Sequence, residues 1–519
     1  MRTLRRGFLA FWLIVASFLC CLSQTPAPPP ATPASDKPPA PAPAQDDPVA
    51  KAQTLLRQGN LDGASDAAEA ALKLKPDSPS ANLVMGEVQF HRGDIGQANE
   101  YIQKALKLSP NDARAWIALS RVAWVVSQRK KAVACIDKAH SLAPNDPAVL
   151  LPWAATRSKN AEAIAGYEQF LEALKKQSPP EQGNKQATAE QDKKPPTPAP
   201  QWVNERIKGL KALGDTETNA LISPVAHYEL PMDYILRDSQ HMQGWETRVA
   251  IGTCKAVKLV IDTGAQGILI GDSLAQKCGI KKLYDGFVIG IGSKPPLGIY
   301  TGLADHVQIG PIEYKNVLID VEDRTPVGDE AGLISTNLLG QFLIHLNLSE
   351  YKLTLDPLPA IPGDDGKTGP KDRYVAPEMA SYAKVFVVDD HLLISTRVGS
   401  DPKSALFLID TGASNNLISQ RYAEKLEKLT KEDWITVRGL QPNLSKVFSA
   451  DDLTLQFAGF RQMNQRLITQ PLPTMGDIQM SGLLGLPILR WFTLHIDYRD
   501  GLVGFEYHEP KGAITDRQR

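Results

Sequence analysis

Two aspartate residues stand in matching short segments of the sequence. Residues 257–271 read VKLVIDTGAQGILIG and residues 405–419 read ALFLIDTGASNNLIS. In both segments an apolar run typical of a β-strand ends at Ile, Asp-Thr-Gly-Ala follows, and a second apolar run begins. Two carboxyl groups held close together cannot both ionise, so they share one proton and can work as a general base and a general acid. The candidate catalytic residues are therefore Asp262 and Asp410.

A single Asp-Thr-Gly is a common turn, so the evidence lies in the duplication. Residues 331–341 (AGLISTNLLGQ) match residues 481–490 (SGLLGLPILR), and the spacing from the aspartate to the Gly-Leu pair is 70 residues in the first copy and 72 in the second. This match predicts two homologous lobes in tandem. Ser335 stands where the second copy has Gly485, so the duplication is stronger evidence for the fold than for activity.

The duplicated motif resembles the two-lobed aspartic proteases of the retropepsin and pepsin type. The resemblance covers about residues 225–356 and 384–507. It implies all-β lobes that bring Asp262 and Asp410 together at a pseudo-twofold axis, where they activate water to hydrolyse a peptide bond. Two readings remain open besides an active aspartic endopeptidase: a catalytically inactive peptide-binding protein of the same fold, and a dyad formed between two chains.

The same resemblance assigns roles to the residues that follow each aspartate. Gly264 and Gly412 would allow backbone conformations and a close approach that a β-carbon would obstruct. Thr263 and Thr411 match the family residues that link the two turns through hydrogen bonds from hydroxyl to backbone. This chemistry requires no metal and no cofactor.

A hairpin over the cleft is expected between each aspartate and its downstream Gly-Leu pair. Residues 286–302 (GFVIGIGSKPPLGIYTG) have the apolar, glycine-rich character of such a flap, and residues 434–448 would be the counterpart in the second lobe. Gly290, Gly292 and Tyr300 are candidate substrate contacts. An ordinary surface hairpin with turn glycines fits the same composition.

The region before the lobes has a period of 34 residues. Pro76, Pro110 and Pro144 are each 34 apart. The same register holds for Ala64, Ala98 and Ala132, for Ala71, Ala105 and Ala139, and for Leu74, Leu108 and Leu142. This pattern resembles the tetratricopeptide repeat, in which small residues let paired helices approach closely and a proline ends the second helix. The resemblance implies an all-α solenoid that binds a protein or peptide partner; a spacer or dimerisation element is the alternative.

The start of the chain predicts export. Arginines precede an uncharged apolar run from Gly7 to Leu22, which is short for a spanning helix of about 20 residues. A cleaved signal is favoured over a retained anchor, and Cys20 or Cys21 is an open candidate for lipidation. The protein is therefore expected outside the cytoplasm, either periplasmic or secreted, with membrane attachment only through this segment.

Composition sets the remaining limits. Lys and Arg number 57 against 58 Asp and Glu, a net charge of -1, so no basic excess is present to hold nucleic acid.

Cys254 and Cys278 flank the first motif and are either a disulfide in an oxidising compartment or buried free thiols. Linkers rich in Pro divide the chain into a signal (1–23), a spacer (24–48), repeats (49–176), a second linker (177–200), lobe 1 (201–357), an inter-lobe linker (358–377) and lobe 2 (378–519).

Overall fold

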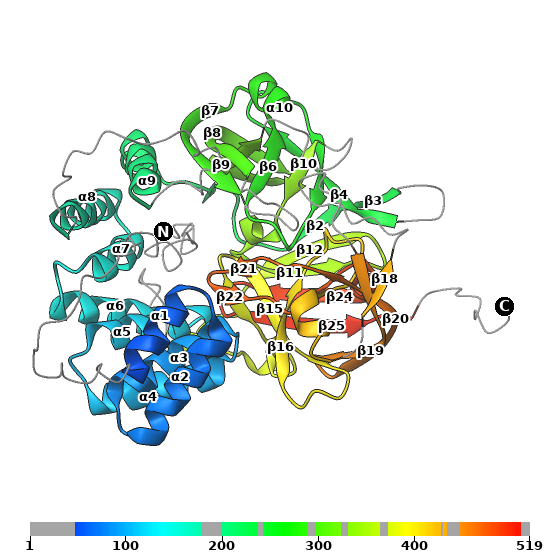
Figure 1. Ribbon diagram of the computed structural model, residues 1–519. Coiled ribbons are helices and arrows are strands. Elements are labelled where there is room, and N and C mark those ends of the chain that lie inside the picture. Colours follow the sequence, from blue (N-terminus) through cyan, green and yellow to red (C-terminus); the bar gives the residue numbers. More distant parts are fainter. Residues whose placement is uncertain are drawn as a thin grey trace, which may run out of the picture.

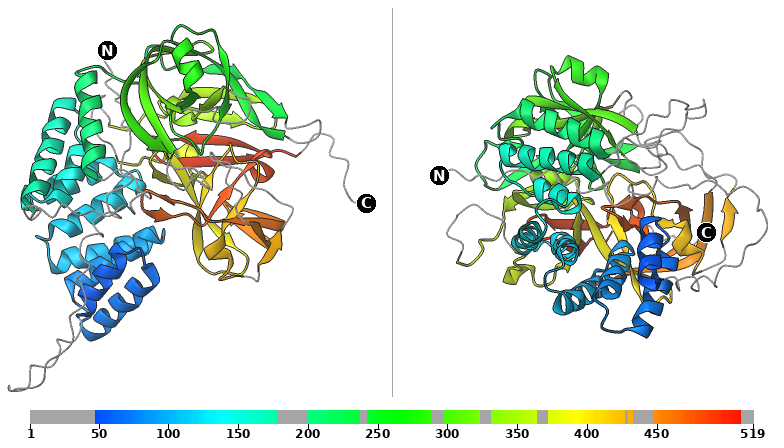
Figure 2. Two further views of the ribbon diagram at one scale, coloured as in Figure 1. Left: turned by 45° about the horizontal axis from the view of Figure 1, so that its top comes forward. Right: turned by 60° about the vertical axis from the view of Figure 1, so that its left-hand side comes forward.

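The computed structural model describes residues 47–177, 199–236, 242–288, 297–322, 331–363, 372–426, 429–432 and 447–509. Within them the chain forms a helical array followed by two β-rich lobes, and the array lies along one side of both lobes (Figures 1 and 2). The predicted signal and nearly all of the first two linkers lie outside the described residues. No helix in the described part of the chain is long and apolar enough to cross a membrane.

The array is built from successive helix pairs. Each helix packs on its neighbours along the chain, and α9, most of which falls in the range that the sequence assigns to lobe 1, packs on α8 as a closing helix. The helices are α1 (Pro48–Arg57), α2 (Leu61–Leu74), α3 (Pro79–His91), α4 (Ile95–Leu108), α5 (Ala113–Val125), α6 (Arg129–Leu142), α7 (Pro147–Ala155), α8 (Asn160–Gln177) and α9 (Ala199–Leu213).

The 34-residue period is explained by the packing of these helices. Ala64, Ala98 and Ala132, one per repeat, are all 0% exposed, because each lies where two helices meet and a larger side chain would hold them apart. Helices α2, α4 and α6 all end at the leucine of the repeated pattern, two residues before the repeated proline. The pattern therefore predicts the helix ends correctly.

The turn inside each of the first three pairs contains one residue with a positive φ. Gly59 (φ 72°) and Gly93 (φ 82°) supply it in the first two pairs, as glycine does most easily. The third pair uses Ser127 at φ 58° instead. Ser127 is only 1% exposed, and it lies against lobe 2, where a β-carbon added to Gly501 would come within 2.5 Å of its Oγ.

Lobe 1 is organised around a nine-stranded sheet with the order β1-β9-β6-β10-β5-β4-β8-β7, and β3 pairs with β4. In the middle of this sheet β10 pairs in parallel with β5, and β6 pairs in parallel with β9. The elements are β1 (Ala220–Leu221), β3 (Asp233–Leu236), β4 (Met242–Ile251), β5 (Val257–Ile261), β6 (Ile268–Gly271), α10 (Asp272–Lys277), β7 (Lys281–Val288), β8 (Leu297–Ile309), β9 (Ile312–Glu322), β10 (Gly332–Ile334) and the 3-10 helix η1 (Thr336–Leu339).

Lobe 2 repeats this arrangement in an eight-stranded sheet with the order β14-β15-β16-β23-β17-β20-β19-β18. Here β16 pairs in parallel with β23, and β17 with β20. A small hairpin, β21–β22, lies beside it. The elements are η2 (Pro377–Met379), β14 (Phe386–Val388), β15 (His391–Val398), β16 (Ser404–Ile409), β17 (Leu417–Ser419), α11 (Gln420–Ala423), β18 (Thr430–Glu432), β19 (Val447–Phe457), β20 (Phe460–Gln470), β21 (Thr474–Met475), β22 (Ile478–Gln479), β23 (Gly482–Leu484) and α12 (Leu486–Leu489).

A third sheet joins the lobes. Its order is β13-β25-β24-β11-β12-β2, so strands of both lobes meet in one layer. Its strands are β2 (Tyr228–Pro231), β11 (Phe342–Asn347), β12 (Lys352–Pro357), β13 (Ala383–Lys384), β24 (Phe492–Asp497) and β25 (Leu502–Tyr507). His345 of β11 pairs with His495 of β24. These histidines are equivalent in the two copies, so the pseudo-twofold axis passes between them, and burial lowers the pKa of both.

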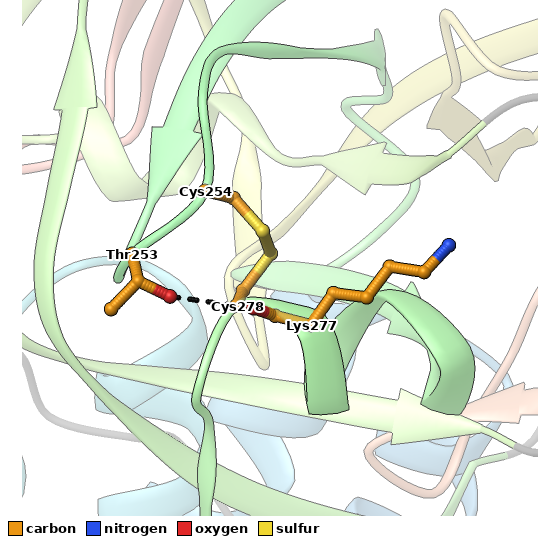
Figure 3. Close-up of a disulfide and its surroundings, with 4 residues drawn as sticks. All are labelled: Thr253, Cys254, Lys277 and Cys278. Atoms are coloured by element: carbon orange, nitrogen blue, oxygen red, sulfur yellow. Dashed lines mark hydrogen bonds between the residues drawn. A yellow bond between two sulfur atoms is a disulfide. The ribbon is translucent and has the colours of Figure 1, made fainter.

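One disulfide closes the part of lobe 1 that carries Asp262. Cys254, in the turn after β4, is bonded to Cys278 at the end of α10 (Figure 3). Beside it, Thr253 donates a hydrogen bond to the Lys277 carbonyl at 3.3 Å. Of the two states that the sequence left open for these cysteines, the structure has the disulfide.

The disulfide is expected to stabilise lobe 1 by restricting the unfolded chain. Because it spans 24 residues, its loss in the Cys254→Ala/Cys278→Ala variant should lower the free energy of unfolding by about 3 kcal/mol. Urea unfolding with and without reductant measures this. Cys135→Ala, which removes the buried free thiol of the array, is the control for cysteine replacement, and reductant should not change the stability of the double variant.

Candidate active site

The two predicted aspartates occupy equivalent positions at the ends of strands. Asp262 follows β5, and its backbone N donates to the carbonyl of Ile334 in β10 at 3.0 Å. Asp410 follows β16, and its backbone N donates to the carbonyl of Leu484 in β23, also at 3.0 Å. The parallel pairing of these strands within each sheet therefore fixes both aspartates in the same way.

The threonines that follow the aspartates tie the two turns together. Thr263 N donates to Thr411 Oγ1 at 3.0 Å, and Thr411 N donates to Thr263 Oγ1 at 3.0 Å. Each hydroxyl then donates across the axis to the last residue of the opposite strand, Thr263 to Ile409 O at 2.7 Å and Thr411 to Ile261 O at 2.9 Å. Both threonines are 0% exposed, so these four hydrogen bonds form without competition from water.

The glycines bring the two carboxyl groups into contact. A β-carbon on Gly264 would lie 2.6 Å from Asp410 Cγ, and one on Gly412 would lie 2.5 Å from Asp262 Cγ. Either would collide with the opposite carboxylate. Since both positions are glycine, the carboxyl groups of Asp262 and Asp410 approach closely enough to share a hydrogen bond.

The electrostatic environment differs between the two aspartates. Burial raises the pKa of Asp262, while the hydrogen bonds donated by Gly264 N and by Asp410 limit the rise. Burial, followed by the neighbouring charge of Asp262, holds the pKa of Asp410 well above its usual range. The pair thus retains one proton at pH values where a free aspartate is ionised. The two carboxyl groups titrate as a coupled pair, so the shared proton belongs to the pair and not to one residue.

The serine that replaces a glycine in lobe 1 is accommodated. Ser335 is 0% exposed; its N donates to Gly267 O at 2.7 Å, and its Oγ accepts from Asn337 N at 3.3 Å. In lobe 2 a β-carbon on Gly485 would lie 2.4 Å from Asn415 O. The two loops therefore follow different local paths, and only the second requires glycine.

Two asparagines that support these loops were missed by sequence reasoning. Asn337 Oδ1 accepts from Gly267 N at 3.0 Å in lobe 1, and Asn416 Oδ1 accepts from Gly485 N at 2.9 Å in lobe 2. Each accepts a hydrogen bond from a glycine N of an active-site loop, but Asn337 lies just after β10 and Asn416 lies just before β17. Alignment of the two copies gives no signal for them because their positions are not equivalent.

A turn of lobe 2 also reaches the active-site loop of lobe 1. Asp389 and Asp390 join β14 to β15, with φ 48° and 63°. Asn337 Nδ2 donates to Asp390 Oδ2 at 3.1 Å, and Gln266 Nε2 donates to the Asp389 carbonyl. The sequence VFVVDDHLLIS, two apolar runs around Asp-Asp, is the signal that could have predicted this hairpin.

The predicted flap is a hairpin in which β7 pairs antiparallel with β8, but Gly290 and Gly292 lie outside the described residues, as does most of the lobe 2 counterpart. Tyr300 belongs to β8. Its hydroxyl donates to Asp272 Oδ1 at 2.9 Å, and burial and this carboxylate raise its pKa to about 12. The structure thus gives Tyr300 a partner within lobe 1 and does not join it to the dyad.

No group of three or more His, Cys, Asp or Glu side chains within the described ranges is arranged to hold a metal ion. The chemistry that the site can support rests on the two carboxyl groups and the backbone and hydroxyl donors around them. A pair sharing one proton has both a base and an acid in place for water to attack a carbonyl group.

Several solved structures are similar to parts of the chain. The aspartic proteinase from Irpex lacteus shares 14% identity at a TM-score of 0.35, over 56% of this chain and 99% of that one. MamA shares 21% identity at a TM-score of 0.22, over 25% of this chain and 77% of that one. A thermophilic TPR protein of Thermus thermophilus shares 22% identity at a TM-score of 0.23, over 25% of this chain and 76% of that one.

Comparison with family models assigns both parts of the chain. Residues 49–113 match the family model described as tetratricopeptide repeat, and residues 247–341 match the one described as aspartyl protease. The second match contains Asp262 and ends before the second copy of the motif. A search of curated proteins finds none that matches this sequence. On the family matches and its own architecture, this chain combines a tetratricopeptide-repeat region with an aspartyl protease domain.

Proposed function

We propose that this chain is an exported aspartic endopeptidase whose catalytic dyad, Asp262 and Asp410, forms within one polypeptide. The observation that supports it is the contact between the two carboxyl groups across the lobes, where each lies against the glycine of the opposite turn. The site is contained in a single chain, which favours an intramolecular dyad over one shared between two copies.

The mechanism assigns a different task to each carboxyl group. The ionised carboxyl group of the pair accepts a proton from a water molecule held between Asp262 and Asp410, while the protonated one donates a hydrogen bond to the substrate carbonyl. Water attacks the carbonyl carbon, and the proton taken up by the ionised carboxyl group passes to the leaving amine. The surrounding donors Gly264 N and Gly412 N, at 2.7 and 2.9 Å from their aspartates, keep both carboxyl groups oriented.

Export and recruitment are parts of the same proposal. The apolar N-terminal segment supports export, and so does the Cys254–Cys278 disulfide, since such bonds persist in oxidising compartments. Fractionation of the producing cells decides the location. We assign to the repeat array the recruitment of a protein or peptide partner, through those surfaces of its helices that the lobes do not cover.

Replacing either aspartate should abolish turnover. Asp410→Asn and Asp262→Asn keep the size of the side chain but remove the shared proton, so kcat/KM on a peptide library should fall by at least about a hundredfold. Asp452→Asn, at an exposed site in β19 of lobe 2, is the matched control. A chain that binds peptides without cutting them, or an Asp410→Asn variant with undiminished turnover, contradicts the proposal.

The pH dependence follows from the shared proton. Below the first pKa of the pair both groups are protonated and no base remains; above the second both are charged and no acid remains, so the profile of kcat/KM should be bell-shaped. Because burial and Asp262 raise the pKa of Asp410, the alkaline limb should lie well above the ordinary aspartate value of about 4. Rates measured from about pH 2 to 8 test this, and a descending limb near the ordinary aspartate value would be inconsistent with a raised pKa.

The serine in the lobe 1 loop should be compatible with activity. Ser335→Gly removes one hydroxyl that accepts a backbone hydrogen bond, which should cost about 1 kcal/mol of stability and leave kcat nearly unchanged. The converse change, Gly485→Ser, puts a side chain against the Asn415 carbonyl and should lower stability by about 1–3 kcal/mol and reduce kcat. Urea unfolding and kcat of both variants measure this. If Ser335→Gly turned an inactive chain into an active one, Ser335 would mark a silenced protease.

A further inference from the structure

Helices of the repeat array pack against lobe 2 through a shared apolar cluster. Helices α3 and α5, the first helices of the second and third repeats, contribute to one apolar cluster with β14, β16, β17 and β23. In the turn between α3 and α4, a β-carbon on Gly93 would come within 3.0 Å of Leu406 Cδ1. The members of this cluster include Phe90, Val122 and Val125 from the array and Val388, Leu406 and Ile478 from lobe 2.

A charged turn of lobe 2 is held by the array inside this apolar contact. Asp477 lies in the turn between β21 and β22, and Arg121 Nη2 donates to its Oδ2 at 3.0 Å, with the two side chains only 16% and 12% exposed. His91 Nδ1 is hydrogen-bonded to the Asp477 carbonyl at 2.7 Å. Arg121 also lies over the Phe90 ring, at 4.4 Å from its centroid. The array therefore binds both the carboxylate and the backbone of this turn.

The turn that contains Asp477 packs against the β14–β15 hairpin, which reaches the active-site loop of lobe 1. A β-carbon on Gly476 would lie 2.5 Å from Val388 Cγ1 and 3.5 Å from Asp389 Oδ2. Val388 is the last residue of β14, and Asp389 begins the turn to β15. Moving the Asp477 turn would therefore move the Asp389–Asp390 turn.

The Asp389–Asp390 turn holds the loop that follows Asp262. As described above, it accepts hydrogen bonds from Gln266 and from Asn337, and Asn337 also binds Gly267 N. A continuous set of contacts thus runs from Arg121 in the array to the loop that follows Asp262.

A second array residue carries a charge near the Asp389–Asp390 turn. Arg129, the first residue of α6, interacts through its charge with Asp390 and with Asp500. Asp500 is only 1% exposed, and its Oδ1 accepts from Tyr374 N at 2.9 Å. The side chain of Asp390 is only partly exposed; burial raises the pKa of its carboxyl group, and the nearby charge of Arg129 limits that rise.

We propose that the face of the array formed by α3 and α5 has lobe 2 of its own chain as its partner, and that Asp477 is a positioning residue through which this docking orders the active-site loop of lobe 1. The kinetic part of this inference rests on the proposed protease function; the structural part does not. A peptide partner would then have to use other faces of the array or displace lobe 2.

The test uses the full chain with Asp477→Asn, because asparagine tolerates the positive φ of 67° at this position while removing the charge. Asp452→Asn is the control: it also replaces an aspartate of lobe 2 at positive φ, 53°, but at an exposed site. Hydrogen exchange is followed by mass spectrometry. Residues 259–271 should exchange about tenfold faster in Asp477→Asn than in the wild type, with strands β19 and β20 unchanged, and Asp452→Asn should match the wild type.

Arg121→Met is the second variant, since it keeps an apolar stem over Phe90 and removes the donor to Asp477. It should give the same increase in exchange, and the double variant should be no faster than either single one because both remove one interaction. If the protease is active, kcat should fall by about tenfold with KM little changed in both variants. Unchanged exchange at residues 259–271, or an equal increase in every segment of both lobes, would overturn the proposal. An inactive wild type would refute the protease function and leave the exchange result to decide the docking.

Discussion

The contact between the carboxyl groups of Asp262 and Asp410 is the constraint on which the rest of the structure depends. Bringing two acids together in a buried site is unfavourable unless a proton is shared and the backbone is held firmly. The threonine hydrogen bonds across the axis hold the backbone, and Gly264 and Gly412 leave the necessary space. The parallel pairs β5–β10 and β16–β23 then hold the two Asp-Thr-Gly turns at equivalent positions in their lobes.

Duplicated residues were the features that the sequence could predict well. The buried alanines of the array repeat every 34 residues because helix pairs pack in the same way in each repeat, and the two Asp-Thr-Gly segments match because the site is nearly symmetric. Both patterns predicted the fold class, which the structure and the family matches confirm. Both aspartates also lie together, as expected, although their catalytic role stays a prediction.

The features that could not be predicted are those that break the symmetry. Asn337 and Asn416 support the two loops from positions that do not align, so comparing the copies could not reveal them. Arg121 and Asp477 are 356 residues apart, and neither lies in a motif. Tyr300, a candidate substrate contact, donates a hydrogen bond from its hydroxyl to Asp272, and its place in the hairpin does not indicate this partner. The residues next to a side chain in the sequence do not determine which distant polar group becomes its hydrogen-bond partner in the folded chain.

The sheet shared by the two lobes has a consequence for how they can exist apart. In the direct pairing of β11 with β24, residues 344–347 of one lobe meet residues 493–496 of the other. A lobe released from its counterpart would leave the amide and carbonyl groups of that strand open along an apolar rim, and such an edge readily pairs with another chain. A fragment bearing one lobe would therefore be prone to self-association.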